Sequence, residues 1–197
     1  TQGYLQFNEV ADTNPNIRFW NGASWGAIAE NIAITGNTQA MGLVAHPTTN
    51  NAIGCTKGST NFITCLLGAN TPSWANVTNG QISTSSTGGI TRSFDMTFES
   101  LSNLGLAVYS NTVNNAIIKY RTYDPATNAF SAQLNGGTIA SANVAAVALR
   151  PHPDTDDIFV LIGSSNSRLS TVVWDGANNQ FYTVGDRALG ERIATGG

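Results

Sequence analysis

The sequence predicts an all-β fold built from repeated short strands. Three observations favour this fold class: a pattern of aromatic residues and turns recurs about every fifty residues, small polar residues dominate, and helical periodicity is nearly absent. Asn, Thr, Ser and Gly number 22, 23, 16 and 20 among 197 residues, and these types favour turns and uncharged surfaces. Charged residues make up only 11% of the chain, against roughly 25% in an average soluble domain.

Each repeat contains a strand that ends in an aromatic residue or Leu, followed by a turn and a second aromatic residue. The strand ends are Trp20, Leu67, Tyr123 and Trp174, at intervals of 47, 56 and 51 residues. Three of the turns carry dipeptides typical of tight turns, namely Asn21-Gly22, Asp124-Pro125 and Asp175-Gly176. The recurrence indicates one structural unit repeated along the chain.

Two further strands are expected before each aromatic strand. The first lies within 40–47, 94–100 and 144–153, and the second within 52–57, 104–109 and 158–162, to which 3–10 is equivalent. Four-stranded meanders repeated at this interval are typical of β-propeller blades. We therefore predict one propeller-like domain over 1–197 with about four blades of four short antiparallel strands, in units of approximately 3–51, 52–103, 104–157 and 158–197. A β-sandwich made from the same hairpins is the alternative.

The first unit lacks a counterpart of the first apolar strand. The segment 191–195 is the only late candidate for it, and its pairing with the first unit would close the ring. Otherwise one sheet edge stays open, and an open edge tends to recruit a strand from another subunit or partner. Self-association, or binding of other surface proteins through that edge, is therefore an expected partnership.

Composition and motifs narrow the function classes. The 9 basic and 12 acidic residues form no Lys/Arg cluster, so we expect no nucleic-acid partner. No apolar run reaches the length of a membrane span, and the uncharged Thr/Asn/Ser-rich composition favours an extracellular or cell-surface location. We find no nucleophile elbow, phosphate-binding loop or paired catalytic carboxylates. The chain is therefore predicted not to be an enzyme.

Two family resemblances follow from the repeats. The segments Trp20–Trp25 and Val173–Gly176, with 94–99 and 106–110 between them, resemble secreted or surface-exposed bacterial proteins with Trp-(Asn/Asp)-Gly repeats. That resemblance implies propeller-like repeats, extracellular exposure and no known catalysis. The segments Ile17–Trp20 and Trp174–Gly176 are similar to blades of fucose-binding propeller lectins, in which an Arg, a Glu and an aromatic residue hold the sugar. Arg18 matches that Arg, but no Glu stands in register.

Basic and aromatic side chains on the third strands are the candidate ligand-binding residues. They are Arg18, Trp20, Arg121, Tyr123, Arg168 and Trp174. Exposed aromatic rings beside Arg in a groove would suit stacking on a sugar or a contact with a protein. The alternative is that aromatic residues at equivalent positions pack between the blades.

One acidic cluster and two histidines are candidates for metal binding. Asp154, Asp156 and Asp157 could supply part of a Ca²⁺ site, although no Gly-centred calcium loop is present, and we expect no other cofactor. His46 and His152 both precede a proline at equivalent turns. Repeat equivalence therefore explains them better than a shared metal does.

The remaining candidates are sites of covalent modification, a disulfide and a glycosylation site. Cys55 and Cys65 fall on neighbouring strands of one expected hairpin, where they can face each other as a cross-strand disulfide or remain a buried reduced pair. Asn76 begins an Asn-Val-Thr glycosylation sequon, which matters only in a host that uses it.

Together these features predict a non-enzymatic extracellular module with a structural or adhesive role in a bacterial surface assembly or filament. The alternative is a carbohydrate-binding, lectin-like propeller that binds a glycan between its blades.

Overall fold

The computed structural model describes residues 2–8, 14–30, 36–60, 62–71, 73–85, 92–111, 116–138, 144–164 and 169–182. In these ranges the chain forms strands and turns, with no helix. Accordingly, they contain no helix that is long and apolar enough to cross a membrane. The prediction of an all-β fold is confirmed.

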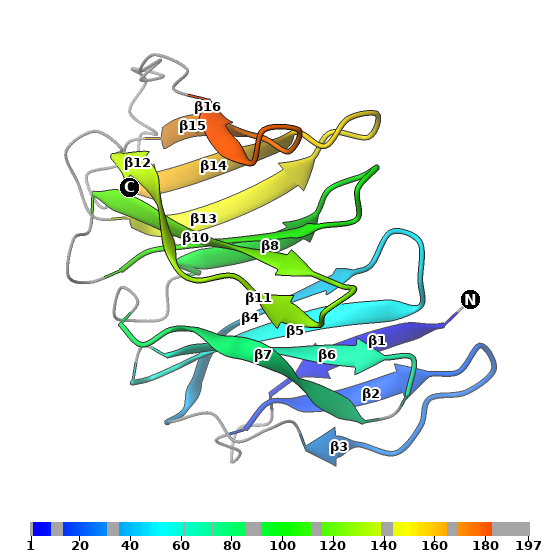
Figure 1. Cartoon of the computed structure of the whole chain (residues 1–197). Coiled ribbons are helices and arrows are strands. Elements are labelled where there is room, and N and C mark those ends of the chain that lie inside the picture. Colours follow the sequence, from blue (N-terminus) through cyan, green and yellow to red (C-terminus); the bar gives the residue numbers. More distant parts are fainter. Residues whose placement is uncertain are drawn as a thin grey trace, which may run out of the picture.

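The strands form successive antiparallel meanders, which are stacked from one end of the molecule to the other (Figure 1). The first contains β1 (Gly3–Phe7), β2 (Asn16–Trp20) and β3 (Ala29–Glu30). The second contains β4 (Thr38–Ala45), β5 (Asn51–Gly58), β6 (Ile63–Ala69) and β7 (Trp74–Ser83). The third contains β8 (Phe94–Phe98), β9 (Gly105–Tyr109), β10 (Ile117–Asp124), β11 (Ala129–Phe130) and β12 (Leu134–Thr138). The fourth contains β13 (Val144–Pro151), β14 (Ile158–Ser164), β15 (Leu169–Asp175) and β16 (Gln180–Tyr182).

The second and third meanders are joined by one parallel pair, Ala129 of β11 with Thr78 of β7. This pair merges them into a single nine-stranded sheet. The number of blades therefore remains a prediction. The first meander has three strands, with β1 at its edge, whereas the segment 191–195 proposed to complete it lies outside the described residues.

The turns form where the sequence predicts them, because side-chain oxygens accept hydrogen bonds from the backbone. Asn21 Oδ1 accepts from the amides of residues 23 and 24, Asp124 Oδ1 from that of residue 126, and Asp175 Oδ1 from that of residue 178. Asn128 and Asn179 then take positive φ angles of 49° and 53°, a conformation that Asn tolerates better than most residues. These turns set the register of the outer hairpins.

Apolar side chains fill the space between successive meanders. One buried cluster joins the second and third meanders and includes Ile53, Phe94 and Tyr109. A second cluster joins the third and fourth and includes Leu106, Val147 and Trp174. The third meander is therefore covered on both faces, and its inner strand β8 is buried along its whole length.

The first meander packs on the second through aromatic rings. The Tyr4 ring lies 5.1 Å from that of Phe19 and 5.5 Å from that of Trp74. Gly68 leaves the room that Tyr4 needs, because a Cβ there would lie 2.9 Å from Cζ of Tyr4.

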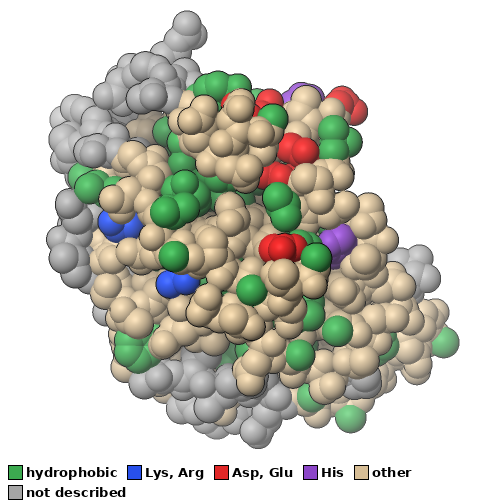
Figure 2. Space-filling model, in the orientation of Figure 1, with side chains coloured by type: hydrophobic (Ala, Val, Ile, Leu, Met, Phe, Trp, Pro, Cys, Tyr) green, Lys and Arg blue, Asp and Glu red, His purple; other side chains and the backbone are tan. Residues whose placement is uncertain are grey.

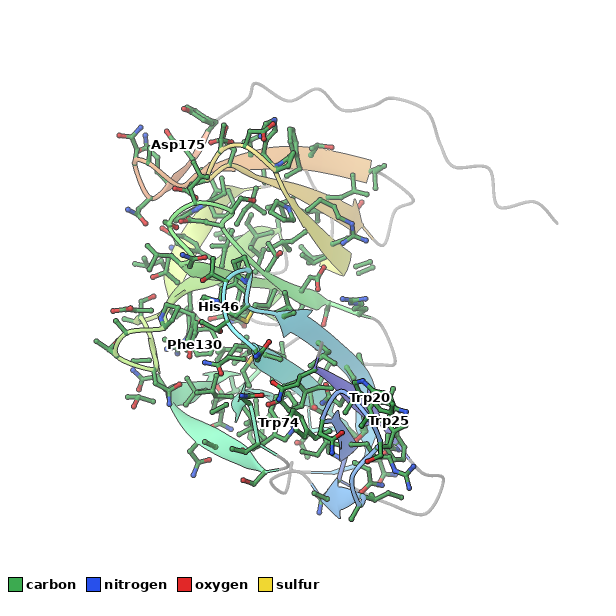
Figure 3. The ribbon with its side chains drawn as sticks, turned by 90° about the vertical axis from the view of Figure 1, so that its right-hand side faces the viewer. Trp20, Trp25, His46, Trp74, Phe130 and Asp175 are labelled. Carbon is green, nitrogen blue, oxygen red and sulfur yellow. A yellow bond between two sulfur atoms is a disulfide. The ribbon has the colours of Figure 1, made fainter. Side chains whose placement is uncertain are left out.

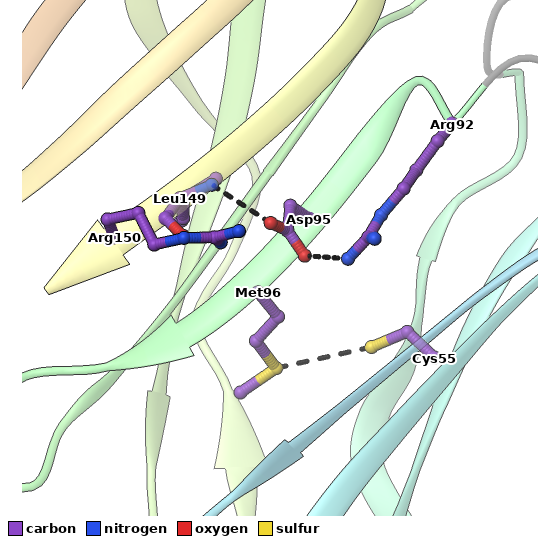
Figure 4. Close-up of polar contacts among 6 residues, drawn as sticks. All are labelled: Cys55, Arg92, Asp95, Met96, Leu149 and Arg150. Carbon is purple, nitrogen blue, oxygen red and sulfur yellow. Dashed lines mark hydrogen bonds and ion pairs between the residues drawn. The ribbon is translucent and has the colours of Figure 1, made fainter. Parts of the chain in front are cut away.

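Cys55 and Cys65 form the predicted cross-strand disulfide. They are directly opposite in the β5–β6 register, as expected for a tight hairpin between two strands. Sγ of Cys55 lies 4.0 Å from Sδ of Met96 on β8 (Figure 4). The disulfide thus belongs to the core between the second and third meanders.

A buried carboxylate connects the inner strands of the third and fourth meanders. Asp95 Oδ1 accepts from Nη2 of Arg92 at 2.6 Å, and Oδ2 accepts from the Leu149 amide at 2.9 Å (Figure 4). The Val147 amide also donates to the Arg92 carbonyl. Because a buried carboxylate requires hydrogen-bond donors, this arrangement holds β8 and β13 in a fixed relation.

Candidate functional site

The predicted ligand-binding aromatic residues belong to three equivalent pairs of rings. The pairs are Trp20 with Trp25, Tyr123 with Phe130, and Trp174 with Phe181, at centroid distances of 5.5, 5.1 and 5.2 Å. Tyr123 and Trp174 are 1% and 0% exposed and pack between meanders, as the alternative interpretation of these residues expects. Trp20 and Trp25 lie at the free end of the stack (Figure 3), where Trp25 is 47% exposed.

The predicted basic residues also differ in their surroundings. Arg121 donates from Nε to the Ile82 carbonyl and from Nη1 to the Ser131 carbonyl. Its guanidinium is therefore held by backbone carbonyls of this chain. Nε of Arg18 is buried and has no hydrogen-bond partner among the described residues. Arg168 lies outside those residues. The five described residues of the predicted set lie on three different meanders.

Trp174 is held by a buried acid that sequence reasoning missed. Its Nε1 donates to Oε1 of Glu99 at 2.6 Å, and Ser102 Oγ donates to Oε2 of the same carboxylate. Burial raises the pKa of Glu99 above its ordinary 4.5, and the nearby charge of Asp156 adds to that rise, while the two hydrogen bonds act against it. Glu99 is 2% exposed, so its role is to anchor the indole.

The acidic loop connects two turns. Asp156 Oδ1 accepts from the Leu101 and Ser102 amides at 2.8 and 2.9 Å. Across the described ranges, no three His, Cys, Asp or Glu side chains form a group that could hold a metal ion. The Ca²⁺ site at Asp154, Asp156 and Asp157 remains a prediction.

The two histidines occupy equivalent turns, as expected. Nδ1 of His46 accepts from the Thr48 amide, and Nδ1 of His152 from the Asp154 amide. Asn76, the sequon residue, is exposed on β7, and its glycosylation remains a prediction.

A groove at the junction of the first two meanders is the candidate binding site. Its volume is about 330 Å³, and its lining residues are Gln2, Gly3, Tyr4, Leu43, Ala45, Thr49, Asn50, Asn51 and Ala52. None of these side chains is charged. On the face in Figure 2 the charged side chains are few, and most of the acidic ones gather toward its upper end.

The groove combines a fixed aromatic wall with hydrogen-bonding groups. Tyr4 is held by the Phe19 and Trp74 rings, and its hydroxyl oxygen accepts from the Thr71 amide at 3.1 Å. Burial raises the pKa of the Tyr4 hydroxyl, which keeps it neutral. Gln2, two residues before Tyr4, also lines the groove, and its Oε1 is buried without a partner among the residues the structure describes. The amide groups of Asn50 and Asn51 and the hydroxyl of Thr49 add further hydrogen-bonding groups to the lining.

Comparisons with known proteins place the fold. No family model matches the chain, and no curated protein matches it. The lectin BP39L from Burkholderia pseudomallei is 12% identical over 91% of this chain and 50% of its own, with a TM-score of 0.65. The fucose-specific lectin of Aleuria aurantia is 12% identical over 92% of this chain and 54% of its own, with a TM-score of 0.55. A structure of the Aleuria lectin is described as a six-bladed β-propeller.

A third neighbour is an enzyme. NanB sialidase from Streptococcus pneumoniae is 13% identical over 86% of this chain and 27% of its own, with a TM-score of 0.54. At these identities the likeness extends to the fold alone, and it favours a propeller-like arrangement over a sandwich. The chain spans about half the length of the two lectins.

Proposed function

We propose that the chain is a non-enzymatic carbohydrate-binding module that binds a neutral glycan in the groove between its first two meanders. The observation that carries the proposal is the groove itself, an uncharged pocket lined by the ring of Tyr4 and by amide and hydroxyl side chains. The fold shared with lectins supports it.

The lining chemistry specifies the class of ligand. Amides of Gln2 and Asn51 and the hydroxyl of Thr49 can pair with sugar hydroxyls, while Leu43 and Ala45 offer apolar contact to ring carbons. A charged sugar or a phosphate would find no cation among these residues. The groove also holds no carboxylate, His or Cys, so it lacks the acid and base groups that glycoside hydrolysis requires.

The cellular context is part of the same proposal. A disulfide in a chain of this composition supports an oxidising, extracellular environment. In that setting, glycan binding is one way for a surface module to adhere to a partner. The structural or filament role stays a separate proposal that depends on the free ends of the stack.

Binding of the unlabelled chain to a glycan array, followed by calorimetry with the best ligand, tests the proposal. Gln2→Ala should weaken binding by roughly two- to tenfold, the effect of one hydrogen bond. Gln180→Ala is the matched control, because Gln180 is exposed on β16 in the last meander. An array without sugar-dependent signal, or equal affinities for the two variants, would refute the proposal.

A further inference from the structure

The two ends of the stack carry the same kind of face that is buried inside it. In the two cores, the third meander is covered on one face by the second meander and on the other by the fourth. We call the face toward the preceding meander the leading face, and the face toward the following meander the trailing face. Among the described residues, no meander covers the leading face of the first meander or the trailing face of the fourth, and these two meanders lie at opposite ends of the stack (Figure 1).

Strand register identifies equivalent positions on the trailing faces. The pairs nearest the hairpin turns are Ala45 with Ala52, Phe98 with Gly105, and Pro151 with Ile158. The equivalent positions lie one and three residues after these pairs on the second strand. They are Ile53 and Cys55 in the second meander, Leu106 and Val108 in the third, and Phe159 and Leu161 in the fourth. The first four are at most 1% exposed, whereas Phe159 and Leu161 are 46% and 40% exposed.

The leading faces show the same contrast. The strand register matches three positions of the first meander to positions of the third and fourth. Leu5 corresponds to Ala107 and Val160. Trp20 corresponds to Tyr123 and Trp174, and Trp25 corresponds to Phe130 and Phe181. The third meander's trio is at most 2% exposed, while Leu5 and Trp25 are 45% and 47% exposed. Positions that are buried inside the stack are thus exposed to solvent at the leading face of the first meander.

A polar group at the first face points to the same missing neighbour. Arg18 and Arg121 both stand two residues before the final aromatic residue of their strand. Arg121 reaches the Ile82 carbonyl on β7 of the preceding meander at 3.1 Å. No described meander covers the face on which Arg18 stands, and its buried Nε has no partner in the described part of the chain.

From these positions we infer that the trailing face of one copy of this chain packs on the leading face of a second copy, with Phe159 and Leu161 against Leu5 and Trp25. A second copy fits because trailing faces of this chain already pack on its own leading faces. Two copies also reach the length of the solved lectins, of which one chain spans about half. Such head-to-tail contacts generate a closed ring or a filament. The inference does not depend on glycan binding.

Two variants test this head-to-tail arrangement without sugar, by sedimentation velocity of the full chain over a wide range of concentration. Phe159→Asp and Trp25→Asp should each remain monomeric where the unsubstituted chain associates, with a loss of about thirtyfold or more in affinity if these side chains dominate the contact. An equimolar mixture of the two variants should form a 1:1 dimer, because one keeps the leading face and the other keeps the trailing face.

Leu101→Asp is the matched control, since Leu101 is 63% exposed in the turn between β8 and β9 and should associate normally. If either variant fails to fold, as judged by its thermal transition, Leu161→Asp and Leu5→Asp repeat the design. A chain that is monomeric at every concentration would overturn the inference. So would single variants that still associate, or a mixture that stays monomeric while the unsubstituted chain associates.

Discussion

Gly54 on β5 is the position at which one added methyl group tests the packing beside the groove. A Cβ there would lie 2.5 Å from Cη2 and 2.6 Å from Cζ3 of Trp74, and 3.1 Å from Oε1 of Gln6. The indole is rigid and contacts the Tyr4 ring, so it cannot move without disturbing the first meander. Overpacking of this kind costs about 1–3 kcal/mol. Replacing Gly by Ala also reduces the conformational entropy of the unfolded chain, which stabilises the fold by up to about 1 kcal/mol.

Gly54→Ala should therefore lower the free energy of unfolding by about 1–2 kcal/mol, which at typical slopes shifts the urea midpoint by roughly 0.5–1 M. Gly163→Ala is the matched control on β14, because its Cβ would meet only Ala146 Cβ at 3.5 Å. It should be neutral or stabilising. In a Trp74→Ala background, the cost of Gly54→Ala should disappear. An equal cost in both backgrounds would refute the steric argument.

Three further changes have defined outcomes. Because burial raises the pKa of Glu99, its contribution to stability is full below its ordinary pKa and is lost as the pH rises through the raised pKa. The free energy of unfolding of the wild type, measured with urea, should therefore fall with rising pH relative to that of Glu99→Gln. Parallel pH curves for the two proteins would contradict this. Replacing Cys55 and Cys65 with Ala removes a link across a separation of 10 residues and should cost about 3 kcal/mol in the loop-entropy model, measured against the oxidised parent. Asp156→Ala removes the acceptor for two backbone amides and should cost about 1–3 kcal/mol, with no change if calcium is added or chelated.

The repeated strands and turns could be predicted because their signals are local. The Asp124 and Asp175 turns are encoded by a few adjacent residues, and both form as expected. The hairpin pattern likewise placed Cys55 opposite Cys65, although it did not decide between a disulfide and a reduced pair. The described part of the first meander has three strands, which agrees with the repeat element that is missing from the start of the sequence pattern.

The candidate site could not be predicted in the same way, because stacking creates it from distant segments. Gln2 and Asn51 meet only where the first meander lies on the second, and neither carries a motif. Aromatic residues such as Tyr123 and Trp174 were visible in the repeat, but periodicity alone does not say whether a neighbouring meander covers them. Glu99 likewise became significant only through its contact with Trp174.

The most direct test of the central claim is an NMR titration of the ¹⁵N-labelled chain with neutral monosaccharides, methyl α-fucoside among them. Glycan binding in the groove predicts saturable amide shifts concentrated at residues 2–4, 43–45 and 49–52. The same titration with a charged sugar should leave these amides unchanged. Absence of saturable shifts with every neutral sugar, or shifts centred on another part of the stack, would contradict the assignment of the groove as the binding site.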